Sequence, residues 1–136
     1  MKSIALLLIA GSLATDPSGG SAKLSAETQQ TVNAMAVQKL AGAEKEMSEL
    51  LGRLRKQGSA NPNAIAALDK SQTMWAQYRD AQVHALWPSS DRNEYGSVYP
   101  VCVAAAKMGM TQSRIAELNA MLESTPGNVC PSAWAQ

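Results

Sequence analysis

The chain has 136 residues, 46% of them hydrophobic, with 12 Lys and Arg residues against 11 Asp and Glu residues. A chain of this length can bury one modest hydrophobic core, which is typical of a single small domain. The near balance of charges excludes an electrostatic basis for binding nucleic acid or an anionic membrane surface. We therefore expect no nucleic-acid partner.

The N-terminal residues have the pattern of an export signal. Lys2 precedes an apolar run from Ile4 to Ala14, and no Cys follows that run as a lipid-attachment site. The run is too short to span a bilayer, which takes about 20 apolar residues. We predict a signal peptide over residues 1–14, with cleavage after Ala14 or, at a second site, after Ala22. The mature protein is then periplasmic or secreted, without stable membrane insertion; the alternative is an uncleaved N-terminal anchor.

Both cysteines, Cys102 and Cys130, lie in the part of the chain that we expect to be exported. Two cysteines in an oxidising compartment most simply form one disulfide. In the chain-entropy description, closing a loop of this size stabilises the fold by about 3–4 kcal/mol. We predict a Cys102–Cys130 disulfide, with two unbridged thiols as the alternative.

The mature part of the chain has the apolar spacing of helices. Residues 15–25 contain the run Asp-Pro-Ser-Gly-Gly-Ser and are predicted to form a flexible leader. Apolar residues at steps of three and four then predict a helix over residues 26–57, with Ser25 as its cap. A second helix is predicted over residues 62–87, with Asn61 as its cap and a proline in its first turn.

The remaining chain adds one or two further helices. We predict that Pro88 ends the second helix, that a third helix covers residues 98–108, and that Gly109 interrupts it. Thr111 is then placed to cap a fourth helix. No alternating pattern typical of strands occurs. The predicted fold is all-α: residues 26–136 form a small antiparallel bundle of three to four helices with one disulfide.

The sequence offers few groups for catalysis. His84 is the single histidine, so neither a histidine zinc site nor a second histidine for a proton relay is available. Cysteines in a disulfide cannot act as nucleophiles. Gly19 and Gly20 lack the Lys-Ser/Thr that completes a phosphate-binding loop, and the acidic residues are interspersed with Lys and Arg, as on a solvated face. We predict no enzyme activity, no catalytic residue, no cofactor and no metal site.

One ordered set of residues is distinctive. It consists of Gln72, Trp75, Tyr78, Arg79 and Asp80, followed by Gly96, Cys102, Thr111 and Arg114. Over about residues 26–122 the chain resembles the LprI-like lysozyme-inhibitor family through this set. The resemblance implies a secreted or periplasmic helical domain that acts by binding a protein, a lysozyme in the member that gave the family its name.

The chain also departs from the family pattern. Met35 and Val83 stand where the family has cysteines, so the resemblance implies that two buried half-cystines are replaced by apolar side chains. Cys130 lies outside the matched region, and a bridge to Cys102 would be particular to this branch of the family.

We expect the residues shared with the family to be mainly structural. Trp75 is predicted to lie in the core, and Tyr78 to bury its ring while its hydroxyl reaches a loop carbonyl. Arg79 and Asp80 are predicted to form a buried pair, in which Arg79 holds the loop 88–100 and Asp80 caps a neighbouring helix. Direct contact with a ligand is the alternative.

The polar segment 88–100 is the one long internal loop of the predicted fold, and recognition residues concentrate in such loops. The candidate contacts for a protein partner are Asp91, Arg92, Glu94 and Tyr95. Their acidic groups could meet the cationic surface typical of lysozymes. The leading hypothesis is therefore a binding protein that occupies the cleft of a lysozyme or related muramidase. The alternative is a structural or accessory module that docks against another envelope protein.

Overall fold

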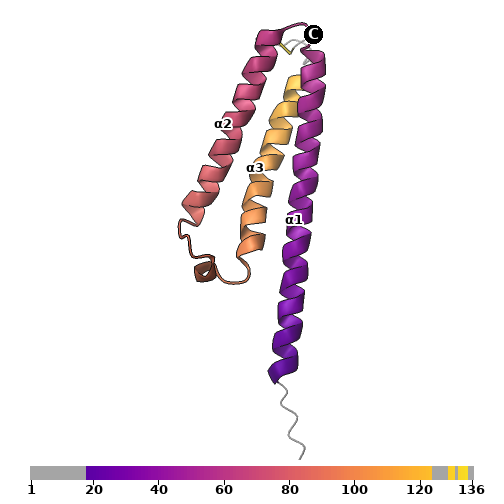
Figure 1. Ribbon diagram of the computed structural model, residues 1–136. Coiled ribbons are helices and arrows are strands. Elements are labelled where there is room, and N and C mark those ends of the chain that lie inside the picture. Colours follow the sequence, from indigo (N-terminus) through magenta and orange to yellow (C-terminus); the bar gives the residue numbers. More distant parts are fainter. Residues whose placement is uncertain (1–17, 124–128, 131, 135–136) are drawn as a thin grey trace, which may run out of the picture.

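The computed structural model describes residues 18–123, 129–130 and 132–134, and within them the protein is helical, without strands (Figure 1). The elements are α1 (Ser18–Gln57), α2 (Pro62–Leu86), the short 3-10 helix η1 (Arg92–Tyr95) and α3 (Tyr99–Leu122). Figure 1 shows α1 and α3 running in the same direction and α2 running against both. The all-α prediction is confirmed, with three α-helices in the described chain.

Helix α1 is longer than predicted. It begins at Ser18 rather than at Ala26, so Ser25 lies inside the helix and is not its cap. The segment predicted as a flexible leader is helical from Ser18 onward, and the predicted signal peptide lies outside the described residues. With 40 residues against 25 and 24 in the other two helices, α1 extends beyond the end of the bundle (Figure 1).

The turn between α1 and α2 follows from local chemistry. Asn61 Oδ1 accepts a hydrogen bond from the Ala64 amide at 3.1 Å, which confirms the predicted cap. Pro62 stands at the first helical position. Its lack of an N–H costs nothing there, because an N–H at that position has no acceptor within the helix. The Gly58 amide donates to the Leu54 carbonyl at 2.8 Å and closes the end of α1. The chain therefore reverses within four residues, Gly58–Asn61.

Helix α3 is continuous, which contradicts the predicted break at Gly109. It runs from Tyr99 to Leu122, so the two helices predicted for this region are one. A glycine inside a helix costs about 1 kcal/mol relative to alanine, and packing against α1 along the length of α3 outweighs that cost. Thr111 consequently lies inside the helix, with 0% of its surface exposed, and is not a cap.

The predicted disulfide is wrong as well. Cys102 and Cys130 are not bridged to each other. Cys102 lies near the start of α3, and Cys130 follows its other end. The helix from Cys102 to Leu122 spans about 30 Å, whereas a disulfide requires Cα atoms about 4–7 Å apart. The prediction rested on the expected compartment and on the number of cysteines, and neither specifies how far apart Cys102 and Cys130 lie.

The hydrophobic core lies at the end of the bundle that holds the α1–α2 turn. Its buried members are Ala43, Met47, Leu50, Leu51, Leu54, Ala64, Leu68, Ile115, Leu118 and Trp134. Helix α3 packs mainly against α1 and less against α2. Of the apolar face predicted for residues 26–57, the part from Ala43 onward is buried, whereas Val32 is 43% exposed.

The C-terminal tail closes the core at this end. The Trp134 side chain is buried, and its carbonyl oxygen accepts a hydrogen bond from Gln57 Nε2 at 2.7 Å. A Cβ atom on Gly58 would lie 2.5 Å from the Trp134 ring. The close approach of the indole therefore requires a residue without a side chain at position 58.

A substitution at Thr111 tests the interior of α3. Its Oγ1 is buried without a hydrogen-bond partner among the described residues, and burying such a hydroxyl costs about 1–3 kcal/mol. We expect Thr111→Val, which keeps the side-chain shape, to raise the free energy of unfolding by about 1 kcal/mol in urea denaturation. In the control Thr73→Val, an exposed threonine, the change should stay within about 0.5 kcal/mol. A destabilised Thr111→Val protein would show that the hydroxyl is hydrogen-bonded in solution.

Candidate functional site

Arg114 of α3 lies at the centre of a polar cluster between the helices. The residue is 8% exposed. Its guanidinium donates to Gln72 Oε1 at 3.2 Å and to Ser71 Oγ at 3.0 Å, both on α2, and to Glu117 Oε2 at 2.8 Å on its own helix. The planar guanidinium suits several partners at once. Arg114 therefore ties α3 to α2.

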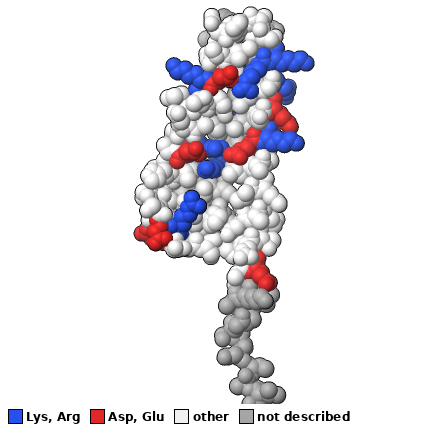
Figure 2. Space-filling view, viewed as in Figure 1, with Lys and Arg blue, Asp and Glu red and all other residues white. Residues whose placement is uncertain are grey.

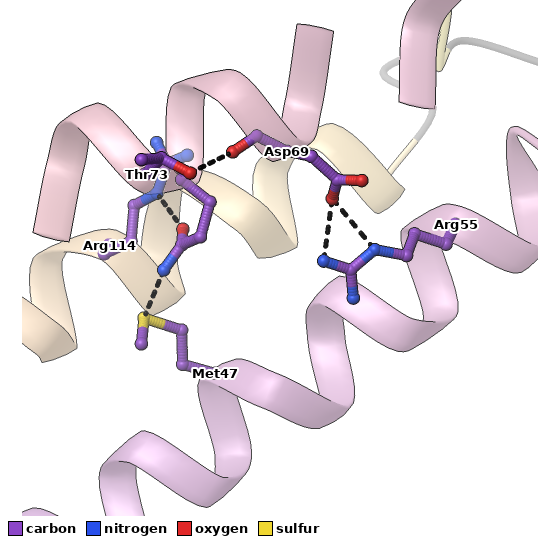
Figure 3. Close-up of polar contacts among 6 residues, drawn as sticks. Met47, Arg55, Asp69, Thr73 and Arg114 are labelled. Carbon is purple, nitrogen blue, oxygen red and sulfur yellow. Dashed lines mark hydrogen bonds and ion pairs between the residues drawn. The ribbon is translucent and has the colours of Figure 1, made fainter. Parts of the chain in front are cut away.

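The cluster continues to α1 (Figure 3). Gln72 Nε2 lies 3.5 Å from the sulfur of Met47 on α1, a weak hydrogen bond. Farther along the same pair of helices, Arg55 of α1 donates to Asp69 Oδ1 of α2 through two nitrogens, at 2.9 and 2.7 Å. Figure 3 shows Arg55 and Asp69 pointing toward each other across the helix pair. These contacts align α2 with α1.

Arg79 forms a second connection between α2 and α1. Its Nη1 atom lies 2.7 Å from Glu44 Oε1, and its guanidinium carbon lies 5.2 Å from the centroid of the Trp75 ring, within the range of a cation–π contact. Arg79 Nε is 3.5 Å from Asp80 Oδ1, an ion pair without a hydrogen bond. Asp80 also pairs with Lys107 of α3 at 3.4 Å. The three helices are thus linked by alternating charges.

Three of the predicted roles at these positions are wrong. Arg79 binds Glu44 rather than the loop 88–100, and Asp80 pairs with Lys107 rather than capping a helix. Tyr78 is 59% exposed, so its ring is not buried. Trp75 is partly buried and packs against the core.

Met35 and Val83, the two positions expected to replace half-cystines, differ in environment. Val83 is 9% exposed, as expected for a replaced half-cystine, but Met35 is 52% exposed. The expectation that both are buried is therefore wrong for Met35.

The loop between α2 and α3 is ordered by its own side chains. Asp91 Oδ1 accepts a hydrogen bond from the Asn93 amide at 3.0 Å and caps η1. Gly96 ends η1 with a φ of 71°, in the left-handed region that favours glycine. Asn33 Nδ2 of α1 donates to the Ser97 carbonyl at 3.2 Å, which holds the loop against α1.

Three aromatic rings brace the same loop. The Tyr95 and Tyr99 rings stack with centroids 5.2 Å apart, and the Tyr99 ring meets Trp87 edge to face at 5.9 Å. The Tyr95 hydroxyl accepts a hydrogen bond from the Ser89 amide at 2.7 Å. Tyr95 is half-buried. It therefore supports the loop, which differs from the exposed contact that the sequence predicted.

Two of the four predicted contact residues remain available to a partner. Arg92 and Glu94 are exposed, and within the described part of the chain neither makes an ion pair. Asp91 is exposed as well, but its carboxylate is occupied as the η1 cap. The loop therefore presents the side chains of Arg92 and Glu94 from a turn that is held in place, with the exposed Asp91 carboxylate beside them.

A groove of about 550 Å³ lies beside this turn. Residues of α1, the loop and α3 line it: Asn33, Val37, Leu40, Arg92, Gly96, Ser97, Tyr99, Pro100, Val103, Ala104 and Lys107. Most of these side chains are apolar. A concave apolar surface with a few polar groups is typical of a binding site.

Elsewhere the charges are mixed. On the face shown in Figure 2, basic and acidic side chains are interspersed, without a broad patch of one sign. Among the described residues no group of three or more His, Cys, Asp or Glu side chains is placed to hold a metal ion. In the same residues, no helix combines the length and apolar character needed to cross a membrane.

The sequence matches a known protein family. Residues 21–118 match the family of the lysozyme inhibitor LprI, which is more than two thirds of the chain. The chain belongs to this family. No curated protein and no solved structure matches it. In this LprI family member the match reaches from α1 to Leu118 of α3, so the tail with Cys130 and Trp134 lies outside it.

Sequence reasoning missed the partners of the shared residues in this LprI family member. Glu44, Lys107 and Ser71 bind Arg79, Asp80 and Arg114 across helix boundaries. Glu44 directly follows Ala43, a member of the buried stripe of α1. This position next to a core residue could have indicated that the Glu44 carboxylate lies at a helix interface rather than on a fully solvated face.

Arg79 provides a stability test of this arrangement. We expect Arg79→Ala to lower the free energy of unfolding by about 1–2 kcal/mol. The loss should be smaller than for a fully buried pair, because the side chains of Glu44 and Asp80 are 41% and 61% exposed and stay hydrated. As a matched control, Arg55→Ala removes an ion pair whose two side chains are 45% and 47% exposed, and should cost less than about 1 kcal/mol. Equal losses in urea denaturation would contradict the structural role of Arg79.

Proposed function

We propose that this protein is an exported inhibitor that binds a lysozyme or related muramidase through protein–protein contacts and performs no catalysis. The observation that carries the proposal is the family match, which covers most of α1, all of α2 and most of α3. In this proposal residues 1–14 are a signal peptide and the mature protein is periplasmic or secreted. Residues 26–136 form the binding domain, without a cofactor.

The loop end of the bundle is the contact surface in this proposal. A segment that blocks an enzyme cleft binds more tightly when it is already ordered, because less conformational entropy is lost on association. The capped η1 turn and the Tyr95–Tyr99 stack meet that requirement. Arg92 and Glu94 project from this turn, whereas Arg79 and Arg114 are engaged between helices.

The two exposed charges fit complementary features of a glycosidase. Enzymes of this class carry a pair of carboxylates that flank the scissile bond in the cleft, and a guanidinium such as that of Arg92 binds carboxylates through paired hydrogen bonds. Glu94 suits the cationic surface typical of lysozymes outside the cleft. Opposite charges on one short turn thus favour a single docking orientation.

Inhibition of cell-wall lysis tests the proposal. The purified mature protein should slow the fall in turbidity of a bacterial cell-wall suspension treated with a lysozyme. Arg92→Ala and Glu94→Ala should each raise the concentration needed for half inhibition about ten-fold, the effect of an interface residue worth about 1–2 kcal/mol. Their melting temperatures should stay nearly unchanged, since both side chains are exposed.

The control for these variants is Glu46→Ala, which removes an exposed carboxylate on α1 that has no ion pair in the described chain. It should inhibit like the unmodified protein. An unchanged lysis rate at saturating concentrations of the unmodified protein would reject the inhibitor proposal. That result would favour the accessory module that docks against another envelope protein.

Export is tested by the mass of the protein recovered from the periplasm or medium. We expect a chain that begins at Thr15, because cleavage after Ala14 leaves α1 whole, whereas cleavage after Ala22 removes the first five residues of that helix. Intact-mass spectrometry distinguishes the two products. A recovered chain that still carries Met1 would contradict signal cleavage.

A further inference from the structure

We propose that the groove between α1, the loop and the start of α3 binds a polypeptide segment of a partner that carries an apolar side chain next to a carboxylate. This site lies beside the turn that carries Arg92 and Glu94. It does not require the partner to be a lysozyme, so it extends the proposed function.

The apolar part of the site comes from two helices. On the α1 side Val37 is 53% exposed, and Leu40 is half-buried. On the α3 side Val103 is half-buried and Ala104 is buried. Covering Val37, Leu40 and Val103 together removes apolar surface from water, which favours binding. A groove of about 550 Å³ has room for one or two apolar side chains of a ligand.

The charged part of the site is cationic. Arg92 and Lys107 are the charged residues among those that line the groove, and no described carboxylate lines it. Lys107 forms an ion pair with Asp80 at 3.4 Å. The Asp80 side chain is 61% exposed, so its carboxylate weakens but does not cancel the field of the Lys107 ammonium group. Arg92 makes no ion pair within the described chain. A carboxylate on the ligand would supply a negatively charged partner for Arg92.

The neighbouring anions lie outside the groove. Asp91 and Glu94 stand on the same turn as Arg92, but neither lines the groove. The Asp91 carboxylate accepts the Asn93 amide. Glu94 is exposed and stays hydrated. The groove therefore discriminates against ligands with Lys or Arg and favours Asp, Glu or a free carboxyl terminus.

The position of Arg92 favours a polypeptide as the occupant. Arg92 belongs to η1 and also borders the groove. A protein that is held at the turn therefore brings part of its own chain to the groove, and the two surfaces are continuous. The groove is braced on one side by the Asn33–Ser97 hydrogen bond, so it is formed before the ligand arrives.

Selection from a displayed library of random heptapeptides on the full mature chain tests the inference. Peptides retained by the unmodified protein should show Asp and Glu next to Leu, Ile, Val or Met, with acidic residues enriched about ten-fold over basic ones. Selection on Arg92→Glu should remove the preference for acidic residues, because the groove then carries one carboxylate against the ammonium of Lys107.

The affinity of the most enriched peptide gives a quantitative check by fluorescence anisotropy. Arg92→Glu should weaken its binding at least about ten-fold. The matched control is Arg53→Glu, which reverses the charge of an exposed arginine near the opposite end of α1, and should change the affinity less than about two-fold. Val37→Asp should also weaken binding, and the melting temperatures of all three variants confirm that they fold.

Two outcomes would overturn the inference. One is a selection without acidic enrichment, or with the same preference on Arg92→Glu. The other is saturable binding of dodecanoate when no peptide is retained, which would assign the groove to a lipid-like carboxylate. Both results are independent of the lysis assay, so the groove and the inhibitor proposal can fail separately.

Discussion

Packing of α3 along α1 determines where the other parts of the molecule lie. Leu54 of α1 and Leu118 of α3 are fully buried in one core at the α1–α2 turn. Because α3 follows α1 as one straight element from this point, its other end stands far from the core, next to the middle of α1 (Figure 1). That arrangement fixes the loop against Asn33 and separates Cys102 from the tail.

Helix α2 is held by polar contacts as much as by the core. Arg79 and Arg114 are largely buried, and each finds carboxylate or amide partners on a neighbouring helix. A buried guanidinium that lost its partners would carry a large desolvation cost, so these pairs select one register of α2 against α1 and α3. Gln72 and Trp75, which we expected to be mainly structural, belong to the same contacts. They therefore explain the fold rather than the choice of partner.

How well the sequence predicted each feature depends on how far apart along the chain the interacting residues lie. The cap at Asn61 was predictable because its partner, Ala64, is three residues away. The helix through Gly109 was not, because α1 supplies the compensating packing and lies more than 50 residues earlier in the chain. Tyr95 was placed on the surface by the polar composition of its loop, while its stacking on Tyr99 depends on a turn whose shape the composition does not specify. The exposure of Arg92 and Glu94 could be predicted from the sequence, since a charged side chain in a polar loop needs no partner within the chain to be stable in water.

The bundle separates stability from recognition along its length. The core, Trp134 and the Arg114 contacts stabilise the end near the α1–α2 turn, whereas the groove and the exposed charges lie at the loop end. Substitutions at Arg92, Glu94 or Val37 act on side chains that are already exposed, so they change little of the surface that folding buries. In this chain the charges of the loop and the lining of the groove can therefore be altered while the contacts of Arg79 and Arg114 keep the helices in register.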